Sequence, residues 1–589
     1  MRLIVPIAVV LILLLQPLQA QIRLKPMDGV EGRYLIEFVS EETAVPTSSS
    51  DIRSMRATQR MHLTRLGKDL YDTDLVIRHD LWLRQAAAIT LSPRFLERLE
   101  RLNYVARIRP ESRFRAESQG VVELPLSKTL AQQHLERIDV DGLWAEGYLG
   151  QGVVVAILDS GVDRLHQDLA LRWRGGSNSW FDPYGEQAEP LDLTGHGTSV
   201  ASLVLGGDAT GSAIGVAPNA QWIAARVFDN SGVSSEGAIS EALQWLLDPD
   251  GDPDTADYPH IVQNSWGLAG TEGSCNNPFA IELAALDALG VLQVFAVGNS
   301  GSAGASSYLT PAFDPHVIPV GAVQADDEIW YESSRGPDLC GHAQIPALVA
   351  PGERIKAANL TFNGFDTDNA SLVDGTSFSS PQVSGALALL VSKYRLKTPK
   401  EAVAALKTAA LDLGGTGADP DYGYGLLRVS AANQLLAEAG VDLKEGGIRF
   451  SRAAYRLLES AGHVSVVLVR TGRIDDPAVV SLLARDGEAE LGKDYDLPSP
   501  QQVEFAPGEY RKTIAVNLID DVQTEGIEHF ELVLSDNGGV NLGEPSRITV
   551  SLLDDEGAGD AEEEIGGASL DPVMLLSLVG LLACGRRRG

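Results

Sequence analysis

The stretch VVVAILDSGV at residues 153–162 decides the fold of this 589-residue chain. Its first six residues form a continuous apolar run, which is typical of a parallel strand buried on both faces. Asp159 follows directly. The carboxyl ends of parallel strands are where ligand-binding and catalytic groups gather in open α/β sheets. We therefore expect an α/β domain in which a buried strand ends on a functional carboxylate.

Apolar strands and helices continue to alternate after this stretch. The pattern predicts strands at 222–228, 261–265, 291–297 and 317–323, and helices at 196–205, 239–247 and 278–289. Strands joined by helical crossovers form a parallel sheet with helices on both faces. We assign residues 126–440 to this domain.

Two motifs place polar side chains at expected helix starts. His196 lies in TGHGT (194–198), and Ser377 lies in GTSFSSP (375–381), before an expected helix at 381–394. Each residue taken alone is more often structural. The order Asp, His, Ser, however, separates this set from the other known chain orders of the same catalytic groups. A helix N-terminus at Ser377 also favours a developing negative charge.

Together these motifs resemble the subtilase family over about residues 130–435. The matching stretches are DSGVDRLHQDL, GHGTSVAS, GVAPNA, AVGNSG, SSRGP, APG and GTSFSSP; WIAARVFD, ALQWLLDPD and IVQNSWG resemble the bacillopeptidase F-like branch. The resemblance implies a subtilisin-like fold and peptide-bond hydrolysis through an acyl-enzyme intermediate. It makes Ser377 the nucleophile, His196 the general base and acid, and Asp159 the residue that orients His196.

The resemblance also implies an oxyanion hole and a substrate cleft. Asn299 matches the oxyanion asparagine, and the Ser377 backbone N–H is the second donor. An extended substrate is expected to add as a strand between two edges. The matching positions are Ser265, Trp266 and Gly267 on one edge, Gly232 on the other, and Gly298 at the floor of the specificity pocket. Core packing is the alternative role for Trp266.

Two positions depart from the family pattern. The serine motif usually reads G-T-S-M-A-x-P, and here Phe378, Ser379 and Ser380 replace its middle. Ser199-Val200 follow HGT, where His or Pro is frequent. We expect these changes to alter core packing and to leave the catalytic chemistry intact.

The first 125 residues are predicted to be two processing segments. A basic start, an apolar run at 3–15 and Ala20 predict a signal peptide over residues 1–20. Residues 21–125 mix expected strands and helices and carry nearly balanced charge. Because they precede a protease domain, they resemble an inhibitory prosegment. A separate adaptor domain is the alternative.

Residues 442–556 change to short alternating strands, which predict an all-β sandwich and resemble a Calx-beta domain. Ca²⁺ takes six to eight hard oxygen ligands, which loop acids can supply. The candidate calcium ligands are Glu459, Asp494, Asp520, Asp521, Asp554 and Asp555, and Asp168 in the catalytic domain matches a calcium position of many subtilases. Solvated acids without an ion are the alternative at these positions.

Residues 557–589 are predicted to be an acidic linker and a C-terminal tail. Gly566-Gly567 precede a short apolar run and three arginines. This resembles the glycine-glycine sorting tails of Gram-negative bacteria, which a rhomboid-like sortase removes after transient membrane contact. A plain tail anchor is the alternative. Both ends therefore predict a secreted or cell-surface protein.

Charge and cysteine content exclude other classes. The net charge of −33 excludes a nucleic-acid-binding protein. Three cysteines are too few for a disulfide framework. Cys584 lies in the tail, and the sequence does not show whether Cys275 and Cys340 meet.

The leading interpretation is an exported endopeptidase that acts on proteins or peptides, with its own prosegment as inhibitor and calcium as a structural ion. The alternative is a calcium-dependent surface binding protein on an inactive subtilase scaffold. The intact set of Asp159, His196, Ser377 and Asn299 argues against it. A narrow processing enzyme with one surface partner is a further alternative, which the sequence does not separate from a broad protease.

Overall fold

The structure is a computed structural model of the full chain. It describes residues 22–26, 32–39, 45–46, 48–70, 75–117, 133–208, 212–341, 344–443, 447–450, 454–470, 476–507, 509, 511–520, 526–536, 540–543 and 545–553. The expected signal peptide, the linker and tail at 557–589, and the candidate calcium ligands Asp521, Asp554 and Asp555 lie outside these residues.

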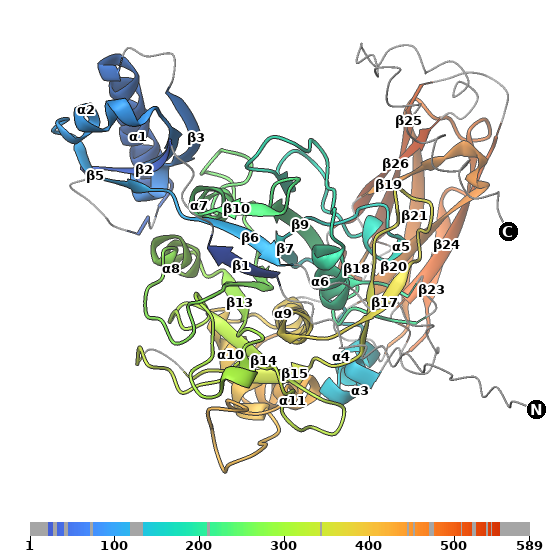
Figure 1. The fold of residues 1–589 in the computed structure, drawn as a ribbon. Helices are drawn as coiled ribbons and strands as arrows, with labels where there is room; N and C mark the ends of the chain where they lie inside the picture. Colours follow the sequence, from blue (N-terminus) through green and yellow to red (C-terminus); the bar gives the residue numbers. More distant parts are fainter. Residues whose placement is uncertain are drawn as a thin grey trace, which may run out of the picture.

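The central unit contains a seven-stranded sheet in which every neighbouring pair is parallel (Figure 1). In order across the sheet, the strands are β15 (Leu348–Pro351), β14 (Ile318–Val323), β13 (Leu292–Ala296), β11 (Ile261–Asn264), β7 (Val154–Asp159), β9 (Gln221–Arg226) and β8 (Trp180–Phe181). The sheet confirms the α/β class predicted from the VVVAILDSGV stretch.

Helices cover both faces of this sheet, because successive strand residues point to opposite sides. Val155 and Ile157 pack in one core with α6 (His196–Leu205) and α9 (Thr376–Lys393). Ala156 and Leu158 pack in a second core with α7 (Glu236–Trp245) and α8 (Ala280–Ala288). The remaining elements of this unit are α3 (Gln133–Ile138), α4 (Asp141–Ala145), α5 (Gln167–Ala170), η4 (Gly301–Ala303), α10 (Lys400–Ala409), α11 (Val429–Glu438) and the antiparallel pair β16 (Ile355–Ala358) and β17 (Ala370–Val373).

A smaller α+β unit, residues 32–117, precedes the central unit; we call it the N-terminal unit. Its antiparallel sheet has the order β3 (Val76–Leu81), β4 (Ala86–Thr90), β2 (Arg33–Phe38) and β5 (Val105–Pro110). Two α-helices and two 3₁₀ turns complete it: α1 (Ser49–Leu70), η1 (Trp82–Arg84), η2 (Pro93–Phe95) and α2 (Leu96–Glu100). Ile36, Leu66 and Leu99 belong to its separate hydrophobic core.

A four-stranded sheet joins the N-terminal unit to the central unit. Its order is β10 (Val233–Ser235), β6 (Arg113–Glu117), β1 (Ile22–Pro26) and β12 (Trp266–Leu268). The outer strands belong to the central unit, and the inner strands come from residues that precede it. Chain segments far apart in sequence therefore complete one sheet (Figure 1).

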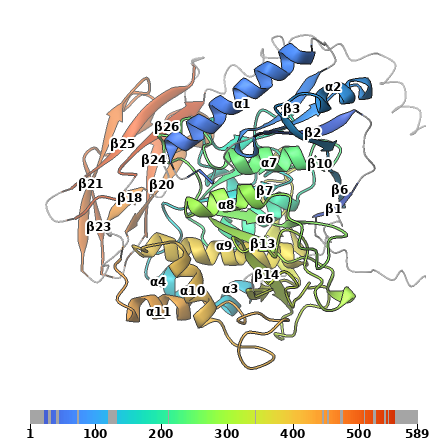
Figure 2. The ribbon, with the colours of Figure 1, turned by 90° about the vertical axis from the view of Figure 1, so that its left-hand side faces the viewer.

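The C-terminal unit consists of two sheets around one core, as predicted for a β-sandwich (Figure 2). One sheet holds β18 (Ile448–Phe450), β20 (His463–Arg470), β24 (Arg511–Leu518) and β22 (Tyr495–Asp496). The other holds β19 (Ala454–Leu458), β26 (Arg547–Leu553), β25 (Glu528–Asp536), β21 (Ala478–Asp486) and β23 (Gln501–Phe505), and η5 (Glu459–Ala461) follows β19. In the described ranges, no helix is long and apolar enough to cross a membrane.

Cys275 and Cys340 form a disulfide, with Cα atoms 5.5 Å apart. The bond joins two loops that are 65 positions apart in sequence. This answers a question that the sequence left open, because loop positions this far apart cannot be paired by spacing alone.

Candidate active site

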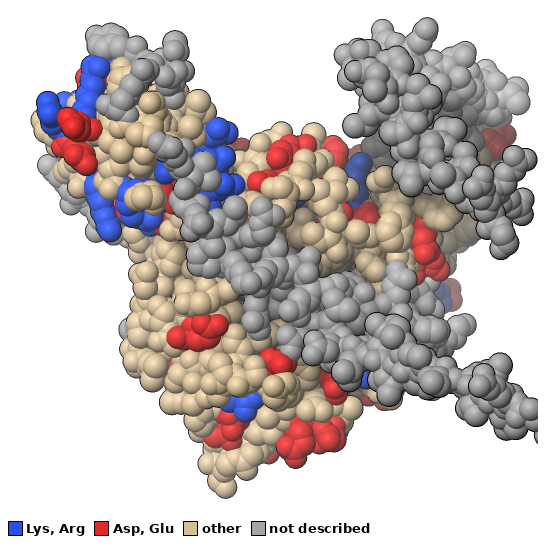
Figure 3. All heavy atoms as spheres, viewed as in Figure 1, with Lys and Arg blue, Asp and Glu red and all other residues tan. Residues whose placement is uncertain are grey.

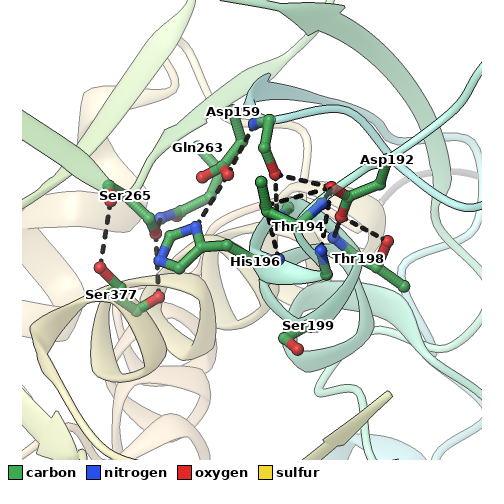
Figure 4. A network of polar contacts seen from close by, with 12 residues as sticks. Asp159, Asp192, Thr194, His196, Thr198, Ser199, Gln263, Ser265 and Ser377 are labelled. Atoms are coloured by element: carbon green, nitrogen blue, oxygen red, sulfur yellow. Dashed lines mark hydrogen bonds and ion pairs between the residues drawn. The ribbon is translucent and has the colours of Figure 1, made fainter. Parts of the chain in front are cut away.

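Asp159 and His196 meet at the carboxyl end of the central sheet. Asp159 ends β7 and is fully buried, and His196 begins α6. Their side chains are joined between Asp159 Oδ1 and His196 Nδ1 at 2.8 Å (Figure 4). Gly197 permits this approach, because a Cβ atom there would lie 2.1 Å from the Gly161 carbonyl oxygen. The carboxylate can therefore hold the imidazole with Nε2 facing Ser377.

Asp192 fixes the start of helix α6, a role that we did not predict from the sequence. Its buried carboxylate accepts hydrogen bonds from the backbone N–H groups of Thr194, Gly195 and Thr198 at 2.9, 3.0 and 2.9 Å. It also accepts one from Ser160 Oγ at 2.9 Å, and Ser160 directly follows Asp159. Asp192 thus connects the start of α6 to the end of β7. It lies before the N-cap residue Gly195, so the usual N-cap signal does not point to it.

The helix that carries Ser377 begins earlier than expected. We predicted a start at Pro381, but α9 begins at Thr376 and contains Pro381. Proline lacks the N–H that would bond the carbonyl four residues earlier, here that of Ser377. The hydroxyl of Ser265 takes this place and donates to the Ser377 carbonyl at 2.9 Å. A side chain from the substrate edge thus satisfies the carbonyl that Pro381 leaves without an N–H.

Ser377 and His196 face each other but are not hydrogen-bonded in this conformation. Ser377 Oγ donates to the Ser265 carbonyl at 3.0 Å. His196 Nε2 has no hydrogen-bond partner in the described part of the chain. Figure 4 shows the imidazole between Asp159 and Ser377. Rotation of the serine hydroxyl away from Ser265 is therefore the step that completes the Asp–His–Ser chain.

Phe378, one of the departures from the expected serine motif, lies against His196. Its ring centroid is 5.5 Å from that of His196, and its side chain is fully buried. Ser380 Oγ accepts from Gln263 Nε2 at 2.7 Å. Ser379 bonds back to the Thr376 carbonyl at 3.0 Å. The replaced positions therefore pack as expected, with the difference that Phe378 contacts His196, a candidate catalytic side chain.

Asn299 lies beside the first turn of α9. Its Oδ1 accepts from the Thr376 N–H at 3.1 Å and from Thr376 Oγ1 at 2.8 Å. These bonds fix the orientation of the amide and leave its NH₂ group on the other side. Gly298 N–H also bonds to Thr376 Oγ1, at 3.3 Å. The structure therefore brings the expected oxyanion donor to the same helix N-terminus as Ser377.

The two expected substrate edges face each other across strands of the N-terminal segment. Gly232 lies in the turn before β10, and Ser265 directly precedes β12. Strand β6 is antiparallel to β10, and β1 is parallel to β12. Trp266 contributes its backbone to β12, while its fully buried ring packs edge-on against Phe279 and Phe295. The ring of Trp266 therefore belongs to the core.

Leu309 packs against Gly298, which we expected at the floor of the specificity pocket, and against Gly267, which we expected on a substrate edge. A Cβ atom on Gly298 would lie 2.8 Å from Leu309 Cγ, and one on Gly267 would lie 2.9 Å from Leu309 Cβ. Gly298 also has φ +115°, which favours glycine. The leucine side chain is 1% exposed. It lies against both glycines, and we did not predict this contact from the sequence.

A buried ion network holds the N-terminal unit against α7 and α8. Arg109 forms two bonds with Glu236, at 2.8 and 2.6 Å, and Arg84 Nη1 reaches the same carboxylate at 3.1 Å. Arg84 Nε also lies 3.7 Å from Glu282 Oε1. Burial alone would raise the pKa of Glu236, but the two guanidinium groups outweigh it and lower this pKa. Burial raises the pKa of Glu282.

The expected calcium ligands fall in two places. Asp168 is buried at the start of α5, and the Arg172 guanidinium donates to its carbonyl oxygen at 3.0 Å. A cationic side chain thus lies beside this position. In the sandwich, Glu459 lies in η5, and the Ile519 N–H donates to the Asp494 carbonyl at 2.9 Å, next to Asp520. Leu518 N–H bonds Gly462 O, so these three acids lie on adjacent loops at one end of the sandwich.

The sequence is similar to known proteins over the region that carries this site. The model of the subtilase family matches residues 150–425. Subtilisin DY of Bacillus licheniformis is 32% identical over 298 residues, covering 50% of this chain and 96% of that protein. The chain belongs to the subtilase family. By this homology it is a serine peptidase.

A second family model matches the C-terminal part of this subtilase. The Calx-beta domain model matches residues 442–556, where the two-sheet unit lies. Bacillopeptidase F of Bacillus subtilis is 32% identical over 277 residues, covering 44% of this chain and 18% of that protein. The alkaline protease of Alkalihalobacillus alcalophilus is 29% identical over 407 residues, covering 69% of this chain and 93% of that protein. This last match is longer than the region of the subtilase model.

Proposed function

We propose that this subtilase is an exported endopeptidase that cleaves proteins through a covalent acyl-enzyme intermediate. The observation that carries the proposal is the convergence of Asp159, His196 and Ser377 at the end of the parallel sheet, with the first pair bonded at 2.8 Å. Asn299 beside the same helix start supports an oxyanion hole.

The proposed reaction assigns a role to each of these residues. His196 Nε2 accepts the proton of Ser377 as the hydroxyl attacks the scissile carbonyl, because a serine hydroxyl is a weak nucleophile at its own pKa. Asp159 stabilises the imidazolium that results. The Asn299 amide and the Ser377 N–H hold the oxyanion. His196 then gives its proton to the leaving amine, and water releases the acyl group by the same steps.

We infer that substrate takes the place of the inner strands between β10 and β12. The N-terminal unit therefore competes with substrate and acts as the inhibitory prosegment of residues 21–125. Pairing of Ser234 with Phe114 in the antiparallel β6–β10 ladder supports this role. A substrate N–H that takes the Ser265 carbonyl also frees the Ser377 hydroxyl for His196, because that carbonyl otherwise accepts the hydroxyl.

We also propose a preference for small side chains before the scissile bond. Leu309 contacts Gly298, the position assigned to the floor of that pocket, and Gly267 on the neighbouring substrate edge, so that a large side chain meets the leucine first. Calcium is the proposed structural ion, held by the adjacent acids of the sandwich. Export through residues 1–20 and removal of the tail by a sorting protease, outside the described residues, complete the proposal.

Parallel expression of the full chain and its Ser377→Ala variant, with calcium, tests this function. We expect the wild type to lose roughly its first hundred residues, as for a prosegment of ordinary domain size, and to hydrolyse casein. The variant is expected to do neither. A variant that matures but does not hydrolyse casein assigns maturation to another protease. Equal behaviour of both proteins, with no cleavage of any protein substrate, favours the surface binding protein instead.

A further inference from the structure

The loop between α7 and β11 gathers acidic side chains away from the active site. It reads DPDGDPDTAD over residues 248–257. Asp248, Asp250 and Asp257 each bring one carboxylate oxygen to within 4.8 Å of the other two. Acids at alternate positions are the pattern with which calcium-binding loops begin. We call these three residues the acidic cluster.

A second observation concerns two carboxylate oxygens of the cluster. The Asp248 side chain is 1% exposed, and its Oδ1 accepts no hydrogen bond from the described residues. Asp257 Oδ1 is buried and equally without a donor there. Burial raises the pKa of both Asp248 and Asp257. Buried charged oxygens without donors are costly, and a bound cation would compensate these two oxygens.

A cation of the N-terminal unit lies against one side of the cluster. Arg56 of α1 donates to Asp248 Oδ2 at 2.5 Å and to the Gly251 carbonyl at 3.2 Å. Its guanidinium also stacks on the Trp82 ring, 4.8 Å from the centroid. Carboxylate and carbonyl oxygens are the ligands that Ca²⁺ prefers. Arg56 therefore occupies oxygens that a calcium ion would use.

The central unit supplies only part of the compensating charge. Arg174 donates to the Asp257 backbone carbonyl at 2.6 Å, and Asn178 Nδ2 donates to Asp257 Oδ2 at 2.9 Å. When the N-terminal unit leaves, Arg56 leaves with it and Arg174 stays. Three clustered carboxylates then face one guanidinium group.

We propose that Asp248, Asp250 and Asp257, with the Gly251 carbonyl, form a calcium site that Arg56 keeps closed in the full-length chain. Loss of the N-terminal unit opens the site, and the bound ion then stabilises the loop that the departing helix had covered. The site itself does not depend on the proposed proteolytic function. Only its opening during maturation does.

Calcium stoichiometry in the unprocessed protein tests the site without proteolysis. The host is the full chain with Ser377→Ala, stripped of metal with a chelator and titrated with Ca²⁺ by calorimetry. We expect the added Arg56→Ala change to raise the stoichiometry by one ion per chain, and Asp250→Asn to remove that ion. Arg53→Ala is the matched control, because Arg53 lies on the same helix but pairs with Asp254, outside the cluster. It should leave the stoichiometry unchanged.

Terbium luminescence gives a local readout of the same event. Trp245 lies beside the cluster, with its indole N–H bonded to the Pro249 carbonyl at 3.2 Å. Tb³⁺ bound there should be sensitised by Trp245 in the Arg56→Ala protein and not after Asp250→Asn. Unchanged stoichiometry and luminescence in all variants would overturn the site. Loss of an ion from the host itself on Asp250→Asn would overturn the closing role of Arg56.

The processed wild-type enzyme serves if Arg56→Ala fails to fold, because it no longer carries Arg56. The processed Asp250→Asn enzyme should then bind one calcium ion fewer and melt at a lower temperature in calcium. Processing without this difference overturns the calcium site alone. Absence of processing instead counts against the proposed function, and the host titration still decides the site.

Discussion

The units on either side of the parallel sheet meet it in different ways. The N-terminal unit lends strand β6 to the edge β10, and its Arg109 is bonded to Glu236, which is only 2% exposed. The C-terminal sandwich keeps a core of its own and joins the central unit through a short segment, where Arg395 N–H donates to the Asp442 carbonyl at 2.7 Å. Basic groups on the visible face gather on the N-terminal unit (Figure 3).

This difference indicates different roles. The N-terminal unit pairs with a sheet edge of the central unit and neutralises its buried acids. When this unit departs, the sheet edge loses its hydrogen-bond partners and the acids lose their cations. This contact supports the proposed role of the N-terminal unit as a competitor of substrate. In the described residues the sandwich strands pair only with one another, so this unit can fold and bind ligands without changing the residues of the candidate active site. The proposed inhibitor and the proposed accessory module thus differ in the contacts that each makes with the central unit.

Replacement of Arg109 should have the largest effect, a weaker inhibition of the processed enzyme by the N-terminal unit. We expect Arg109→Ala in separately expressed residues 21–125 to raise the inhibition constant against the processed enzyme by roughly 30-fold or more, since breaking a buried charge pair costs about 2–5 kcal/mol. Arg53→Ala is the control, because Arg53 and Asp254 are 52% and 62% exposed. An exposed pair contributes about 1 kcal/mol or less. Equal effects of both changes would show that the buried Arg109 pair does not hold the N-terminal unit more strongly than the exposed Arg53 pair.

Replacement of Leu309 tests whether the catalytic domain itself limits which substrates bind, apart from competition by the N-terminal unit. We expect Leu309→Ala to raise kcat/KM for substrates with phenylalanine before the scissile bond, relative to alanine, by roughly tenfold or more. Inhibition by residues 21–125 should change less. Leu283→Ala is the control for lost packing, because Leu283 is a buried leucine of helix α8. An unchanged ratio would show that Leu309 does not limit the pocket.

Acid should weaken the N-terminal contact. The pKa of Glu236 is lowered when Arg109 and Arg84 are docked, against the opposing effect of burial. A lowered carboxyl pKa stabilises the complex above the ordinary value of about 4.3, and that stabilisation is lost as the pH falls through the docked value. Calorimetric titration of residues 21–125 into the Ser377→Ala catalytic domain should therefore show weaker binding at pH 3 than at pH 6. Glu236→Gln should flatten this dependence.

Deletion of the sandwich should have the smallest effect. Without residues 442–556, we expect kcat/KM on a short peptide to stay within about twofold, because the triad and Asn299 lie on elements with a separate core. Peptide hydrolysis by the two processed proteins measures this. A loss of tenfold or more would place the sandwich in the catalytic unit and erase the contrast with the N-terminal unit.

Local motifs predicted the candidate catalytic groups, and long-range contacts decided the rest. Asp159, His196 and Ser377 could be found through their motifs and their chain order, because each residue alone is more often structural. The Arg109–Glu236 pair could not, because its members are 127 positions apart and each reads as an ordinary surface charge. Pro381 misled the helix prediction, since the Ser265 hydroxyl satisfies the Ser377 carbonyl from another element. Leu309 was missed because a buried leucine carries no functional signal by itself.

Covalent labelling of the processed enzyme tests the central claim most directly. A fluorophosphonate reacts with an activated serine, and peptide mapping by mass spectrometry identifies the labelled residue. The account predicts one adduct, on Ser377, whose formation follows the loss of casein hydrolysis and is strongly slowed by His196→Ala. An adduct on another residue in an active preparation, or full activity of a preparation labelled on Ser377, would contradict it.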